Sequence, residues 1–174
     1  MTTLFARLLG DKFDRLPPRV RALHARETAH VYAGRADVDR GANVMARLMG
    51  AATRLPTRKS DQELRVTIEP SADGERWTRK FADHAMPSRL WDAGGLLCER
   101  LGLVTFGFRL DVEDGELTWR VERVRSLGIP LPARLFNGVV AREFDRDGRY
   151  GFEVRAELPL VGLLVHYRGW LDVE

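Results

Sequence analysis

Three Asp-Gly pairs constrain the fold of this chain more than any other feature, because each lies between segments in which apolar and polar residues alternate. The pairs are Asp73-Gly74, Asp114-Gly115 and Asp147-Gly148. Asp and Gly tolerate the positive φ angles of a two-residue hairpin turn, so each pair predicts a turn between antiparallel strands. Three such hairpins predict an antiparallel meander.

The predicted strands have one apolar face and one polar face, and about eight of them rarely remain a flat sheet. We therefore expect a mainly β (α+β) fold, with a strongly curved antiparallel sheet or lipocalin-like barrel and short helices at one end. The alternative is a helix-grip, START-like half-barrel. That fold requires one long helix in the concavity of the sheet, whereas the helices in this sequence are short, which favours the barrel.

The pattern along the chain assigns the individual elements. Residues 4–9 have helical spacing, and Asp14 is the expected N-cap of a second helix with Pro17 or Pro18 in its first turn. The prolines of residues 129–132 predict a break in the sheet. The remaining expectations are a first strand over residues 30–39, a helix over 43–52, a loop over 57–62, strands over 64–69, 104–112, 117–121, 139–143, 150–158 and 163–173, and a helical turn over 133–137.

The hairpin at Asp114-Gly115 has the clearest register. A two-residue turn there places Leu110 opposite Trp119, and the apolar residues of both strands then lie on the same face. Trp119 is therefore expected to be buried, and it is a candidate residue of an interior pocket. Trp77, Phe81, Phe106, Phe108, Phe152 and Trp170 complete the set of aromatic residues expected to line the interior.

Charged residues also lie on the predicted inner face. With the turn at Asp73-Gly74, Ile68 lies opposite Arg79, so Arg79 shares the inner face with Glu75, Trp77 and Phe81. The same counting around Asp147-Gly148 places Glu143 on the inner face, opposite Phe152 or Tyr150. A buried ion without a partner is costly. We expect Arg79 to pair with Glu143 or Glu75 as a structural ion pair at the mouth of the barrel, or to meet a ligand.

The sequence contains no catalytic or metal-binding signature. Its four histidines have no metal-ligand spacing, and no serine lies in a nucleophile elbow. His166 lies in the apolar stretch 163–171, where a hydrogen-bonded interior histidine is expected, and it completes the candidate ligand-binding set. We expect no metal, no cofactor and no catalytic residue.

Composition places the chain among ordinary soluble globular proteins of one domain. Its 174 residues are 44% hydrophobic and 30% charged. Residues 1–60, the helices and first strand, carry 12 basic and 5 acidic side chains, whereas residues 61–174, the β meander, carry 16 and 20. The absence of a long apolar run argues against a transmembrane segment, and the single cysteine favours the cytoplasm. Because the basic residues are mostly Arg, a skew typical of genome composition, we expect no nucleic-acid partner.

Several segments of the chain resemble the bacterial DUF4166 family. They are LFARLLG (residues 4–10), LPP (16–18), LH (23–24), GRA (34–36), GERWTRKF (74–81), LGIPLP (127–132), ARE (141–143) and YRGWL (167–171). The family has no assigned activity, so the resemblance transfers no catalytic residue. Because some members are joined to a nucleotide-binding oxidoreductase domain or to membrane proteins, the resemblance implies an oxidoreductase or membrane-associated partner.

Three functional hypotheses follow. The favoured one is a binding module that holds a small apolar or amphipathic ligand in a barrel pocket, because inward aromatic side chains with a few inward charges are typical of such pockets. The second is an accessory interaction domain with a filled core that acts through its basic helical front, including Arg19 and Arg21. The third, an enzyme using Arg79, Glu143 and His166, has the least support.

Overall fold

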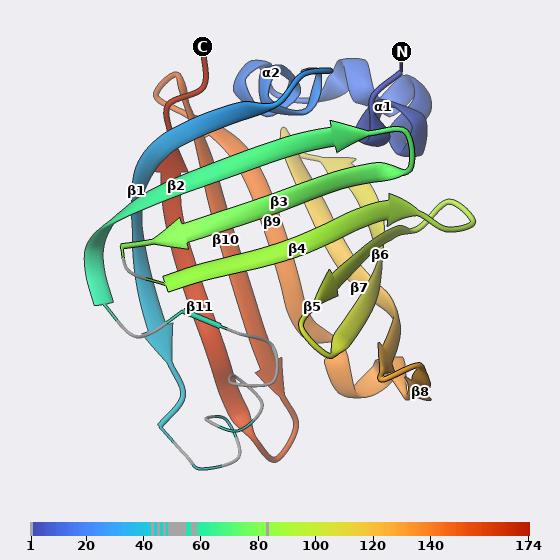
Figure 1. Ribbon diagram of the computed structural model, residues 1–174, viewed down its shortest axis with the longest axis vertical. Helices are drawn as coiled ribbons and strands as arrows, with labels where there is room; N and C mark the ends of the chain where they lie inside the picture. Colours follow the sequence, from blue (N-terminus) through green and yellow to red (C-terminus); the bar gives the residue numbers. More distant parts are fainter. Residues whose placement is uncertain are drawn as a thin grey trace.

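The computed structural model describes residues 2–42, 44, 46, 48, 55–56, 59–82 and 84–174. Most of these residues form one antiparallel sheet, which curves into a barrel (Figure 1). The strands are β1 (His30–Arg40), β2 (Lys59–Ser71), β3 (Gly74–Phe81), β4 (His84–Asp92), β5 (Leu97–Leu101), β6 (Val104–Glu113), β7 (Glu116–Ser126), β8 (Ile129–Leu131), β9 (Gly138–Arg146), β10 (Arg149–Leu158) and β11 (Gly162–Leu171).

The barrel closes because the last strand pairs with the first. β1 lies between β2 and β11, and β7 pairs with both β6 and β9, so ten of the described strands form a closed antiparallel cylinder of sequential neighbours. β8 is an additional strand that pairs only with the end of β7. The fold is therefore mainly β and matches a lipocalin-like barrel, not the open half-barrel of the alternative prediction. Closure leaves the ten strands without a free edge.

Two of the three Asp-Gly turns have the predicted geometry. Asp114 and Gly115 have φ angles of 50° and 78°, and Asp147 and Gly148 have φ angles of 55° and 74°. Leu110 lies opposite Trp119 in the first hairpin, as the sequence predicts. Glu143 lies opposite Phe152 in the second, which was one of the two predicted partners.

The third turn differs from the prediction by one residue. β2 continues to Ser71, which pairs with Gly74, so the two turn residues are Ala72 and Asp73. Arg79 consequently lies opposite Val66, whereas a turn at Asp73-Gly74 predicts Ile68 as its partner. Moving a two-residue turn by one position changes the pairing by two residues, and a shift of two preserves the face on which each side chain lies. Arg79 therefore still faces the interior.

Short helices cover one end of the barrel (Figure 1). α1 (Leu4–Leu9) begins after Thr3, whose hydroxyl accepts a hydrogen bond from the backbone of Ala6. The 3₁₀ helix η1 (Gly10–Arg15) includes the predicted N-cap Asp14, so that prediction is wrong, and α2 (Pro18–His24) begins at Pro18 with Pro17 as N-cap. Proline is favoured there because the first helical turn leaves backbone N–H groups without partners.

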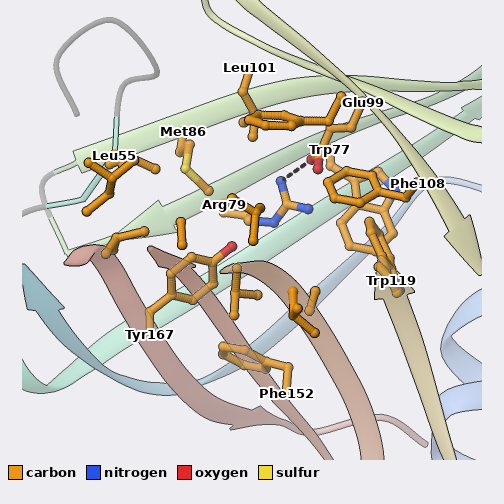
Figure 2. A pocket seen from close by; sticks show the side chains of 18 of the residues that line it. Leu55, Trp77, Arg79, Met86, Glu99, Leu101, Phe108, Trp119, Phe152 and Tyr167 are labelled. Atoms are coloured by element: carbon orange, nitrogen blue, oxygen red, sulfur yellow. Dashed lines mark hydrogen bonds and ion pairs between the residues drawn. The ribbon is translucent and has the colours of Figure 1, made fainter. Parts of the chain in front are cut away.

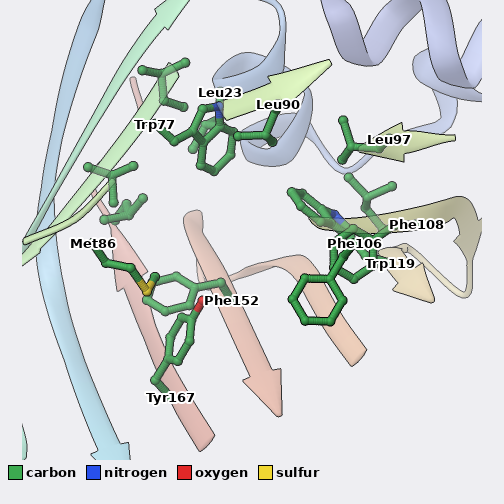
Figure 3. Close-up of a cluster of buried hydrophobic side chains, with 14 of the residues drawn as sticks. Leu23, Trp77, Met86, Leu90, Leu97, Phe106, Phe108, Trp119, Phe152 and Tyr167 are labelled. Carbon is green, nitrogen blue, oxygen red and sulfur yellow. The ribbon is translucent and has the colours of Figure 1, made fainter. Parts of the chain in front are cut away.

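The core fills the capped end of the barrel and extends along its inner wall. Phe5 of α1 and Val20 of α2 are fully buried, and the rings of Phe5 and Trp119 are 5.6 Å apart. Figure 3 shows part of this cluster, in which aromatic side chains from several strands point inward together with Leu23 of α2. Trp170 was predicted to belong to the interior, but it lies on the outer face, where the Arg149 guanidinium is 4.4 Å from its ring centre.

The other differences concern segments with weak patterns. The sequence pattern predicts no strand between residues 82 and 103, where the structure has β4 and β5. The predicted loop 57–62 includes the start of β2, and the predicted break at residues 129–132 contains β8, an edge strand that tolerates Pro130. The helical turn 133–137 is confirmed as η2 (Ala133–Phe136). Most of the helix expected over 43–52 lies outside the described residues.

Candidate functional site

The interior of the barrel contains a cavity of about 290 Å³. Side chains from β2 to β11 and from η2 line it, and most of them are aliphatic or aromatic. Figure 2 shows the part of the cavity around Arg79. The polar residues of the lining are Arg79, Glu99, Ser126, Arg142, Glu143, Tyr150 and Tyr167.

Arg79 of β3 provides the cation of this cavity. Its Nη1 donates hydrogen bonds to Glu99 Oε1 and to Ser88 Oγ, both at 3.0 Å, and its guanidinium carbon lies 4.8 Å from the centre of the Trp77 ring. Burial lowers the pKa of Arg79, but Glu99 and the nearby tyrosines raise it above its ordinary value. Both hydrogen bonds that Arg79 donates to described residues leave from Nη1, and neither uses Nε or Nη2, the other donors of the same planar group.

Two tyrosines lie close to this ion pair. Tyr167 of β11 points its hydroxyl toward Arg79 (Figure 2), and burial raises its pKa to about 12 although Arg79 acts in the opposite direction. Burial also raises the pKa of Tyr150 well above its ordinary value, and a hydrogen bond to Glu143 adds to this effect. Both hydroxyls are therefore protonated at neutral pH and can act as hydrogen-bond donors.

Glu143 connects the barrel to its helical cap. Its Oε2 lies 2.6 Å from Nε2 of His24, the last residue of α2, and both side chains are buried. The His24 ring also stacks on Phe5 with 3.6 Å between the ring centres. The contact joins residues that are 119 positions apart in the chain. It fixes α2 over the barrel end.

Glu75 lies at the same end and has a local partner. Its Oε2 accepts a hydrogen bond from Trp77 Nε1 at 2.7 Å, two residues along β3. Burial raises the pKa of Glu75 above its ordinary value, although this hydrogen bond acts in the opposite direction. Glu75 is not among the residues that line the interior cavity. Its role is to orient the Trp77 ring, which does line it.

The predicted partner of Arg79 is therefore wrong. The structure pairs Arg79 with Glu99, whereas Glu143 pairs with His24 and Glu75 with Trp77. Arg79, Trp77, Phe81, Trp119 and Glu143 do line one cavity, as their placement on the inner face implied. Sequence reasoning missed Ser88 and Glu99 because it assigned no strand to their segment. Residues 163, 165, 167, 169 and 171 share one face of the predicted last strand. The alternation of this strand therefore predicts that Tyr167 points inward.

His166 does not belong to this site. Its neighbours Val165 and Tyr167 point inward, so His166 lies on the outer face, where its Nε2 is 2.7 Å from Glu153 Oε1. His166 is hydrogen-bonded as predicted, but its predicted place in the interior is wrong, and so is its assignment to the pocket. The enzyme hypothesis required Arg79, Glu143 and His166 to act together, and the structure does not bring these three side chains to one place.

The side chains of the described residues do not form a recognisable metal site. No group of three or more His, Cys, Asp and Glu side chains among them is positioned to hold a metal ion. The cavity offers the Arg79 guanidinium, the hydroxyls of Tyr150, Tyr167 and Ser126, and carboxylates that already have partners. The half-exposed Arg142 side chain pairs with Glu116 and Glu153. Such a set can hold and orient a ligand through hydrogen bonds.

Together, the closed antiparallel barrel, the helical cap and the internal cavity define a lipocalin-like barrel protein. Residues 16–171 match the model of DUF4166, a domain of unknown function, and the chain belongs to this family. A comparison with curated proteins finds no match. None of the described helices is long and apolar enough to cross a membrane.

Proposed function

We propose that this protein is a binding module for a small, mostly apolar ligand that carries one hydrogen-bond-accepting group. The observation that supports this proposal most directly is the cavity of about 290 Å³, whose apolar wall contains the guanidinium of Arg79. Ligand pockets are typically apolar concavities with a few polar groups that fix orientation. Here the polar groups are Arg79 and Tyr167.

The volume limits the size of the ligand. An apolar cavity of about 150 Å³ holds one benzene molecule, and this cavity has about twice that volume. We therefore expect a ligand with about a dozen non-hydrogen atoms inside the barrel. A longer molecule is accommodated only if part of it extends beyond the cavity.

The charge balance favours a neutral ligand. Glu99 already neutralises Arg79, and the two protonated tyrosines add no charge. A carboxylate entering this cavity would introduce an uncompensated negative charge into an apolar environment, which is costly. A ketone, aldehyde, ester or amide oxygen accepts hydrogen bonds from the other donors of the Arg79 guanidinium, Nε and Nη2, without this cost.

Two measurements test the proposal. Native mass spectrometry of the protein purified from its source cells is expected to show a bound small molecule. Tryptophan fluorescence, which reports on Trp77 and Trp119 in the wall, is then used to titrate methyl nonyl ketone and decanoate, two ligands of equal size. We expect tight binding of the ketone and weaker binding of the carboxylate. Failure to bind either ligand, together with a protein free of small molecules, would overturn the proposal.

A variant separates ligand binding from folding. Arg79→Met with Glu99→Met removes both charges and keeps the apolar bulk, so the fold is expected to persist. If Arg79 orients the ligand, this double variant binds methyl nonyl ketone no better than undecane. Val31→Ser on the outer face of β1 is the matched control, and its ligand affinity is expected to equal that of the wild type.

The location of the protein and its partner also remain proposals. A cytoplasmic location is supported by the free, buried Cys98. An oxidoreductase or membrane-associated partner is supported by family resemblance. The alternative of an interaction domain required a filled core, and the internal cavity does not favour it. Arg19, which that alternative used, donates a hydrogen bond to the backbone oxygen of Val173 at 2.7 Å.

A further inference from the structure

The end of the barrel opposite the helical cap carries exposed apolar side chains. In a barrel of sequential antiparallel strands, the connections alternate between the two ends, so the β5–β6, β7–β8 and β10–β11 turns all lie at the end away from α1 and α2 (Figure 1). We name the exposed apolar residues of these turns, together with those of β8 and η2, the apolar rim: Leu103, Leu127, Ile129, Leu135 and Leu160.

Leu127 shows that folding alone does not explain these residues. Leu127 and Gly128 form a two-residue turn with φ angles of 50° and 83°, nearly the same as the 50° and 78° of Asp114 and Gly115 at the capped end. Asp or Asn is the usual residue at such a position, because a short polar side chain tolerates positive φ. Leu127 is strained there and is also 73% exposed. Leu160, fully exposed with a φ of 66°, combines the same two features.

The surface beside the apolar rim is basic. Arg89, Arg100 and Arg125 lie on one row across the outer face, because Arg89 pairs with Arg100, Arg100 with Thr105, and Thr105 with Arg125. Like charges in directly opposite positions destabilise a sheet. None of the three arginines forms an ion pair with a described residue, and residues 100–110 and 123–142 contain no Asp or Glu.

The strand turns at the capped end differ in composition, although the helices that cover this end are basic and carry Arg7, Lys12, Arg15, Arg19 and Arg21. Its turns carry Asp73, Asp114 and Asp147 where the other end carries leucines. The strand turns therefore differ between the two ends of the barrel: acidic turns lie at one end, and apolar tips beside Arg100 and Arg125 lie at the other.

We propose that the apolar rim docks on an anionic membrane surface. The leucine tips insert between the lipid headgroups. Arg100, Arg125 and Arg134, which is an exposed residue of η2, meet the lipid phosphates. A lipid surface suits these residues better than a nucleic acid, because single-stranded nucleic acids are held by aromatic side chains that stack on bases, whereas the exposed tips here are aliphatic. The acidic turns then face away from the negative surface. This proposal does not depend on ligand binding in the cavity.

Vesicle flotation tests the proposal. The full chain is mixed at low salt with vesicles of pure phosphatidylcholine, or of equal parts phosphatidylcholine and phosphatidylglycerol. We expect binding to the mixed vesicles at least about tenfold tighter than to the neutral ones, because each arginine near an anionic surface contributes. The binding is expected to weaken as salt screens these charges.

Leu127→Asn separates the apolar contribution from folding. Asn suits the positive φ at this turn, so the melting temperature is expected to be equal or higher, while binding to the mixed vesicles falls about tenfold because an inserted side chain is lost. Arg100→Gln with Arg125→Gln is expected to remove most of the preference for anionic vesicles. Asp114→Leu, which creates the same tip at the capped end, is the control and is expected not to increase binding.

Three outcomes would overturn the proposal. The first is a wild-type protein that does not float with the mixed vesicles at low salt. The second is a folded Leu127→Asn variant that binds them as tightly as the wild type. The third is an Asp114→Leu variant whose binding increases, because any exposed leucine would then suffice and the position of the apolar rim would have no meaning.

Discussion

Arg79→Met tests the interior ion pair most directly. Arg79 is 9% exposed and Glu99 is 5% exposed, and their side chains meet at 3.0 Å. Met retains much of the apolar bulk of Arg but removes every donor, so Glu99 would stay buried without its counter-charge. Removing one partner of a buried pair costs about 3–5 kcal/mol. We expect the free energy of unfolding of Arg79→Met to fall by about this amount.

Substituting Glu99, alone and together with Arg79, measures how strongly the two side chains depend on each other. Glu99→Met leaves the guanidinium with Ser88 as its remaining described Nη1 acceptor, and we expect a loss of similar size. Replacing a whole buried pair by apolar residues of similar volume is often neutral or stabilising. The variant with both substitutions is therefore expected to be far more stable than either single variant, with a coupling free energy of several kcal/mol, about 3 or more.

Urea unfolding followed by tryptophan fluorescence and by circular dichroism measures these four free energies. The outer-face pair of Arg109 and Glu122 is the matched control, since its side chains lie in solvent, and we expect it to show little coupling in the same cycle. If the losses of Arg79→Met and Glu99→Met simply add in the double variant, the two side chains do not depend on each other and the reasoning is refuted.

Three further predictions concern the barrel. Gly115→Val is expected to lower stability by about 1–2 kcal/mol because a β-branched residue resists the φ of 78°; a melting temperature equal to the wild type would contradict this. Trp119→Ala is expected to cost about 3–5 kcal/mol in urea unfolding, and a smaller loss would show that the site collapses. Burial raises the pKa of Glu75, so its protonated form contributes stability that is complete below the unfolded-state pKa and lost as pH rises through the folded pKa. Glu75→Gln should therefore raise the melting temperature at neutral pH, with a gain that shrinks toward about pH 4; a gain independent of pH would exclude this explanation.

The fold was largely predictable because its two strongest signals are local. Alternation identifies the face of each strand, and an Asp-Gly pair identifies the turn. At Asp114-Gly115 both signals agree, and the observed pairing of Leu110 with Trp119 follows from them. At Asp73-Gly74 the turn was placed one residue late, yet Arg79 was still assigned to the correct face because the error moved the register by two.

The partners inside the site could not be predicted in the same way. Ser88 of β4 and Glu99 of β5 face inward, so the polar residues that bind Arg79 interrupt the alternation by which their strands would be recognised. His24 reaches Glu143 from a helix more than a hundred residues away. The pattern within one segment predicts the face of the strand on which a side chain lies. The partner of that side chain, in contrast, depends on how segments distant in the sequence pack together.

The three interior carboxylates show how the polar groups are distributed along the barrel. Glu75 bonds within its own strand, Glu99 bonds between β5 and β3, and Glu143 bonds between β9 and the cap. Because each carboxylate is buried, each needs its partner in the folded state. The contact of Glu143 with His24 therefore couples the helical cap to the barrel. α2 supplies His24, the only described ion-pair partner of Glu143, and Phe5 of α1 stacks on the His24 ring. The cavity is closed at this end by groups that the barrel itself requires. We therefore expect the proposed ligand to exchange at the opposite end, beside the apolar rim.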